Sequence, residues 1–102
     1  PVTLVFGAMR DKDVRAIGAE LFPVAERLVL TRPDNVRAAA PEELIYATPP
    51  RHDLSTIALA PSVSDALTLA RTLTPAGGLI CVTGSLYLVG EAKAALQAAR
   101  DV

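Results

Sequence analysis

The sequence has no excess of charge, no long hydrophobic run and almost no cysteine. Ten Lys and Arg residues stand against eleven Asp and Glu residues, which gives a net charge of -1. Without a basic run, the chain lacks the positive surface that binds a nucleic-acid backbone, so we expect no nucleic-acid partner. Apolar runs such as Leu79 to Val82 fall far short of the roughly 18 residues that a transmembrane helix needs, so we expect no membrane segment.

The remaining composition is typical of one folded domain. Hydrophobic residues make up 51% of the 102 residues, too many for a disordered chain, and this length suits a single core over residues 1–102. Cys81 is the only cysteine and lies in an apolar run, so we expect a buried side chain and no internal disulfide. Because the chain starts at Pro1 without Met or an apolar signal segment, we interpret it as a fragment of a longer cytoplasmic protein.

Four short apolar runs are typical of buried strands, and helical patterns separate them. The predicted strands are Val2 to Phe6, Arg27 to Leu30, Ser55 to Leu59, and Leu79 to Val82. The predicted helices carry, in order, Val14, Ile17, Leu21 and Phe22; Pro41 to Tyr46; Val63, Ala66, Leu67 and Ala70; and Val89, Ala92, Leu96 and Ala99. Asp11 or Asp13 suits the cap of the first helix, and Ser62 with Asp65 suits that of the third.

This alternation of solid apolar strands with helices predicts an α/β fold. We expect a mainly parallel sheet with helices on both faces, joined by right-handed crossovers. Ligands of such sheets bind beyond the carboxyl ends of the strands. The loops at those strand ends are therefore the candidate site.

The loop after Phe6 places cations at this edge. Arg10 and Lys12 stand beside Asp11 and Asp13, without the glycine spacing of a dinucleotide-binding or phosphate-binding loop. Two interpretations remain open. The residues either contact a phosphate or carboxylate, or they cap the next helix with solvated neighbours.

The loop after Val82 places two hydroxyls at the start of a helix. Thr83 and Ser85 flank Gly84, where free N–H groups and the positive helix end favour an anion. Ser85 equally suits a simple N-cap. His52, the only histidine, lies in a proline-flanked loop without Cys or His partners at metal-ligand spacing, so we expect a surface residue and no metal site.

Three segments of the sequence carry a resemblance to a known family. They are Leu4-Val5-Phe6-Gly7-Ala8-Met9 with Asp11-Lys12-Asp13; Leu30-Thr31 leading to Arg37-Ala38 and Glu43-Leu44; and Val82-Thr83-Gly84-Ser85-Leu86-Tyr87-Leu88-Val89-Gly90-Glu91. In order and spacing they resemble the C-terminal domain of folylpolyglutamate synthase/dihydrofolate synthase, of the Mur ligase superfamily. The resemblance runs from Val2 to about Leu96, and the last segment is its most specific part.

The resemblance implies a Rossmann-like three-layer domain that closes over an N-terminal ATPase domain while a ligase adds glutamate to folate through an acyl phosphate. The implied site residues are Ser85, Gly84, Thr83 and Tyr87 on the glutamate side, and Lys12, Asp11 and Arg10 at the ATP-side cleft or domain closure; none is implied to be catalytic. ATP and Mg would bind mainly outside this chain, which lacks the family's phosphate loop, magnesium ligands and D-G-A-H-N segment. We therefore expect the isolated chain to hold no cofactor and to be inactive.

Two other functions compete with this one. A non-catalytic α/β binding module would share only the fold, since one fold hosts many functions. A different Mur-type ligase would add another amino acid to a cell-wall precursor.

Overall fold

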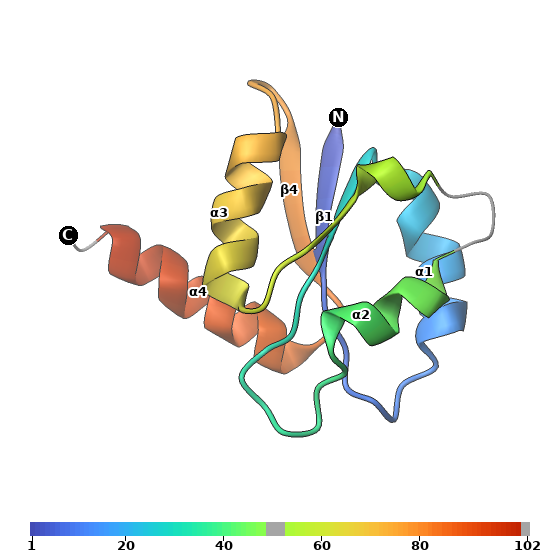
Figure 1. Cartoon of the computed structure of the whole chain (residues 1–102). Helices are drawn as coiled ribbons and strands as arrows, with labels where there is room; N and C mark the ends of the chain where they lie inside the picture. Colours follow the sequence, from blue (N-terminus) through green and yellow to red (C-terminus); the bar gives the residue numbers. More distant parts are fainter. Residues whose placement is uncertain (49–52, 101–102) are drawn as a thin grey trace.

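The computed structural model describes residues 1–48 and 53–100, so the expectation for His52 lies outside the described residues. Four strands form one sheet in the order β3-β2-β1-β4, with every pair parallel. The strands are β1 (Val2–Phe6), β2 (Arg27–Leu30), β3 (Ile57–Leu59) and β4 (Leu79–Thr83), and the helices are α1 (Val14–Leu21), α2 (Pro41–Leu44), α3 (Val63–Leu73) and α4 (Leu86–Arg100) (Figure 1). The predicted parallel α/β fold is confirmed.

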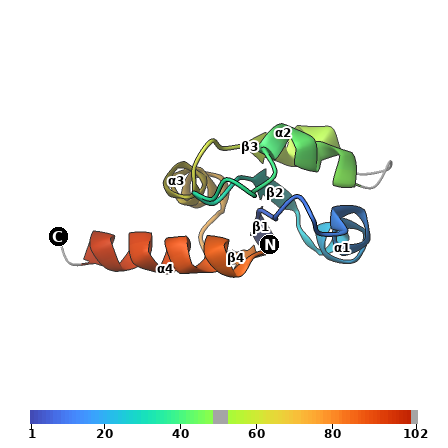
Figure 2. The same ribbon diagram turned by 90° about the horizontal axis from the view of Figure 1, so that it is seen from below.

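The alternation of side chains along the strands builds two cores, one on each face of the sheet. Leu4, Phe6, Leu28 and Leu30 pack with Phe22 and with residues of α1 and α2. The ring of Phe6 meets that of Phe22 edge to face, with centroids 5.0 Å apart. The remaining helices, α3 and α4, lie on the opposite face (Figure 2), so helices cover the sheet from both sides.

That second core is lined largely by small residues of α3. Val5 and Val29 of the sheet are fully buried against Ala66 and Ala70. Because these alanine side chains are small, α3 lies close to the sheet. On its other side α3 packs against α4, whose Leu88 is fully buried.

Two of the predicted elements differ in part from the expectation. The third strand begins at Ile57 rather than Ser55, because the Asp53 carboxylate accepts a hydrogen bond from the Ser55 N–H at 2.9 Å and caps a 3₁₀ turn over Leu54–Thr56. The second helix ends its α-helical part at Leu44 and continues as a 3₁₀ turn over Ile45–Ala47. The Asp13 side chain caps α1, and Ser62 with Asp65 caps α3 as predicted.

The expectation of a buried Cys81 is wrong, because its side chain is exposed. Cys81 stands in register with Leu4, so it lies on the face that α1 and α2 cover. Those helices pack over β1 and β2, whereas β4 is one of the two edge strands. Leu79, two residues earlier on the same face, is 61% exposed for the same reason. A four-residue apolar run thus reports strand propensity but not which strand is central.

Strand order also determines which loops meet. Phe6 at the end of β1 is in register with Leu30 of β2 on one side and with Thr83 of β4 on the other. After β1 the chain crosses to the face of α1, and after β4 it crosses to the opposite face (Figure 2). Such a point, where neighbouring connections diverge, leaves a crevice at the sheet edge. Among the described residues no helix is both long and apolar enough to cross a membrane.

Candidate functional site

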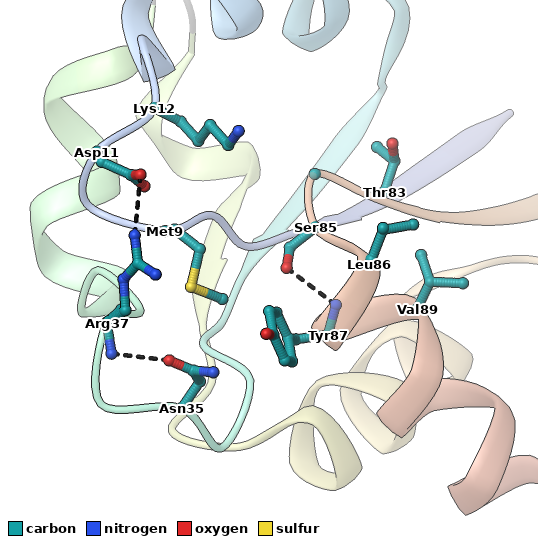
Figure 3. A pocket seen from close by; sticks show the side chains of 11 residues that line it. Met9, Asp11, Lys12, Asn35, Arg37, Thr83, Ser85, Leu86, Tyr87 and Val89 are labelled. Carbon is teal, nitrogen blue, oxygen red and sulfur yellow. Dashed lines mark hydrogen bonds and ion pairs between the residues drawn. The ribbon is translucent and has the colours of Figure 1, made fainter.

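A pocket of about 570 Å³ opens at this crevice (Figure 3). Its walls come from the loops after β1, β2 and β4 and from the first turn of α4. The lining residues are Met9, Asp11, Lys12, Asn35, Arg37, Thr83, Gly84, Ser85, Leu86, Tyr87 and Val89. The charged members are two cations and one carboxylate, so the lining has a small positive excess that favours an anionic ligand.

Two glycines allow the walls to approach each other. Gly84 has φ +116°, and a Cβ there would lie 2.3 Å from the carbonyl oxygen of Gly7. A Cβ on Gly7 would in turn lie 2.7 Å from the carbonyl oxygen of Thr31. Three loop backbones therefore stack without intervening side chains, and the β4–α4 turn sits directly on the β1–α1 turn.

The loops after β1 and β2 are joined by backbone pairing beyond the sheet. Met9 and Ala38 form an isolated antiparallel bridge. Next to it, the Arg10 N–H donates to the Arg37 carbonyl at 2.9 Å, and the Ala39 N–H donates to the Ala8 carbonyl at 2.9 Å. This pairing fixes the wall that carries Met9 and Arg37 relative to the strand ends.

Side chains of Asn35 and Glu91 complete the shape of the loop after β2. The Asn35 amide oxygen accepts a hydrogen bond from the Arg37 N–H at 2.9 Å, which forms an Asx turn. Beside it, the Asp34 N–H donates to the carboxylate of Glu91 on α4. The loop after β2 is thereby tied to the helix that forms the opposite wall.

Ser85 is the N-cap of α4 and also lines the pocket. Its Oγ accepts a hydrogen bond from the Tyr87 N–H at 3.1 Å, which satisfies one of the unpaired N–H groups of the first turn. The hydroxyl proton is not used by this bond and remains available to an acceptor in the pocket. The capping and ligand-binding interpretations of Ser85 are therefore compatible.

The two predicted clusters meet in this pocket. Lys12 and Asp11 line it together with Thr83, Gly84, Ser85 and Tyr87, although more than 70 residues separate the two segments. Figure 3 shows the Asp11 carboxylate turned toward Arg37 while the Lys12 chain extends toward the side of β4. Arg10 is not brought into the lining; its guanidinium lies 3.7 Å from Glu43 at the start of α2.

Sequence reasoning missed the contribution of the loop after β2. Asn35 and Arg37 line the pocket, and Arg37 pairs with Asp11 at 3.1 Å. The signal that could have found them was position, because a polar loop stands after a predicted parallel strand, as it does after Phe6 and Val82. In the described ranges, no three His, Cys, Asp or Glu side chains gather as metal ligands would.

Comparison with known proteins gives one family and a consistent set of structures. The family model for the Mur ligase, glutamate ligase domain, matches residues 1–86. Folylpolyglutamate synthase of Mycobacterium tuberculosis complexed with ADP and AMPPCP is 30% identical, with a TM-score of 0.82 over 91% of this chain and 23% of that one. No curated protein sequence matches significantly.

A second enzyme gives the same result at lower identity. E. coli FolC in complex with ADP is 25% identical, with a TM-score of 0.85 over 99% of this chain and 23% of that one. The structure of E. coli FolC in complex with DHPP and ADP has a TM-score of 0.84 over 97% of this chain and 22% of that one. The chain thus spans less than a quarter of the length of the structures it matches.

Proposed function

Since the chain belongs to the Mur ligase family as its glutamate ligase domain, we propose that it forms most of the C-terminal domain of a folylpolyglutamate synthase. The ligase would add L-glutamate to folate at the expense of ATP, with dihydrofolate synthesis as a further activity. The likeness to folylpolyglutamate synthases over more than nine-tenths of the chain supports this assignment. The N-terminal ATPase domain of the same polypeptide would be the partner of this domain.

The proposed chemistry proceeds in two steps. A folate carboxylate attacks the γ-phosphorus of ATP, which releases ADP and forms an acyl phosphate. The amino group of glutamate then attacks the acyl carbon, an amide bond forms, and phosphate leaves. Both steps bring anions together in one cleft, so positioned cations and hydrogen-bond donors lower the barrier.

The single observation that carries the proposal is the union of a cation, a hydroxyl and a helix N-terminus in one pocket. Ser85 would donate its free hydroxyl proton to a carboxylate of glutamate at the start of α4. Thr83, Gly84 and Tyr87 would shape the glutamate side of the pocket. Lys12 and Asp11 would face ATP or the closing domain, with Arg10 outside the lining and paired to Glu43.

The reaction also needs Mg²⁺ to offset the charge of the triphosphate. Among the described residues, no three His, Cys, Asp or Glu side chains gather into a metal site, and Mg²⁺ in such reactions is held largely by the phosphates and water. No step of the proposal is therefore assigned to a metal held here, and triphosphate and metal would be bound mainly by the rest of the ligase. A cytoplasmic location belongs to the same proposal, because the reaction consumes ATP.

The test is the acceptor preference of the full-length protein. We expect glutamate-dependent release of ADP with a folate acceptor, and a product heavier by one glutamyl residue in mass spectrometry. Activity only with a UDP-linked cell-wall precursor would assign the chain to another Mur-type ligase. Absence of turnover with either acceptor would favour a binding module.

A further inference from the structure

Both backbone polar groups of Arg37 are hydrogen-bonded in the pocket wall. Its N–H donates to the Asn35 side chain and its carbonyl accepts from the Arg10 N–H, both at 2.9 Å. The neighbouring Ala38 bridges to Met9. The backbone of Arg37 is thus fixed within its own loop by Asn35 and against the loop after β1 by Arg10 and Met9.

The guanidinium of Arg37 has one partner among the described residues. It donates to the Asp11 carboxylate at 3.1 Å, and the two side chains are 71% and 58% exposed. An ion pair this exposed stabilises a fold by at most about 1 kcal/mol. Fold stability is therefore a weak reason for the pair, and most of the five guanidinium N–H groups remain unused.

The pair also affects the neighbour of Asp11. Asp11 and Lys12 are adjacent in the chain and both line the pocket, but the Asp11 carboxylate is turned toward Arg37 (Figure 3). Lys12 makes no ion pair within the described residues. The lining therefore holds two cations and one carboxylate, and the carboxylate pairs with Arg37 and not with Lys12.

We propose that Arg37 binds an oxyanion of the substrate in this pocket and that Asp11 is a positioning residue that holds the guanidinium ready for it. This inference rests on the proposed ligase function and adds a residue to its site. The guanidinium fork matches a carboxylate or a phosphate with two parallel hydrogen bonds. The oxyanion comes either from glutamate or from ATP, and the KM values for these two substrates distinguish the two sources.

The test compares Arg37→Gln, Arg37→Lys and Asp11→Asn in the full-length ligase. Arg15→Gln is the matched control, because Arg15 is exposed on α1 and does not line the pocket. We expect Arg37→Gln to raise the KM of one substrate about 10- to 100-fold, as loss of a charged hydrogen bond does. A rise for glutamate identifies a carboxylate, and a rise for ATP identifies a phosphate.

The other variants separate positioning from binding. Arg37→Lys keeps the charge without the fork, so it should recover part of the lost affinity. Asp11→Asn keeps the guanidinium but removes its ion pair. The same KM should therefore rise less than in Arg37→Gln, and kcat should stay nearly unchanged. The inference would be overturned if Arg37→Gln lowered the melting temperature but had the same KM values for glutamate and ATP as Arg15→Gln. The Arg37–Asp11 pair would then only link the two loops structurally. A wild-type ligase without glutamate-dependent turnover would overturn the proposed function itself.

Discussion

Replacing Gly84 by alanine tests the backbone contact that brings the pocket walls together. At φ +116° an L-residue is strained by about 1–3 kcal/mol. The new methyl would also stand 2.3 Å from the Gly7 carbonyl oxygen and 2.9 Å from the Phe6 ring. Gly7 cannot retreat freely, because its own α-carbon faces the Thr31 carbonyl. Overpacking of this kind costs a further 1–3 kcal/mol or so.

We therefore expect Gly84→Ala to lower the free energy of unfolding by about 3 kcal/mol. For a domain of this length, that corresponds to a fall in Tm of roughly 12–24 °C. The measurement is thermal unfolding followed by far-UV circular dichroism, with urea unfolding for the free energy itself.

Gly90→Ala is the matched control for this substitution. Gly90 lies inside α4, and a Cβ there meets nothing within 4 Å. Alanine should therefore raise stability by about 0.8–1.0 kcal/mol through helix propensity. Opposite signs for the same chemical change would isolate the contact with Gly7. Equal Tm values for Gly84→Ala and the wild type would refute the stacking of loops that shapes the pocket.

The pocket and the edge strand give three further predictions. Lys12→Ala in the full-length ligase should raise the KM for ATP about 10-fold or more. Lys93→Ala is the control, because Lys93 is exposed on α4, and it should leave this KM unchanged. An unchanged KM for ATP in Lys12→Ala would mean that Lys12 is only a solvated neighbour of the helix cap. Cys81 in the 102-residue chain should react with one equivalent of a thiol reagent without denaturant, and a reaction that requires unfolding would contradict the exposed edge of β4. The same isolated chain should neither hydrolyse ATP nor ligate glutamate, and measurable turnover would place the triphosphate machinery within it.

The pattern of apolar runs predicted the fold because both cores depend on it directly. Val2 to Phe6 and Arg27 to Leu30 are strands with the predicted bounds, and all of their residues except Val2 and Arg27 are buried. The third strand is shorter than expected because Asp53 competes for the Ser55 backbone with a local hydrogen bond. Cys81 was misjudged because burial depends on strand order, which local pattern does not contain.

The candidate site was predicted in part for a related reason. Lys12 and Ser85 were found because they lie in the loops directly after parallel strands, and they share one pocket. Arg37 was missed, because its role depends on the antiparallel pairing of two loops through Met9 and Ala38. No periodicity in the sequence reports such pairing between segments almost 30 residues apart. The stacking of Gly84 on Gly7 is likewise a consequence of tertiary packing.

The central claim is that Ser85 binds the incoming glutamate as well as capping α4. Ser85→Ala removes the hydroxyl, and Ser62→Ala is a matched control that removes the N-cap of α3. Each variant should lose about 0.5–2 kcal/mol of stability. Only Ser85→Ala should raise the KM for glutamate, by roughly 10- to 150-fold, with a much smaller change in the KM for ATP. The decisive measurement is the KM for glutamate in the full-length ligase. An unchanged value in Ser85→Ala, together with a lowered Tm like that of Ser62→Ala, would contradict the claim and leave Ser85 as a helix cap.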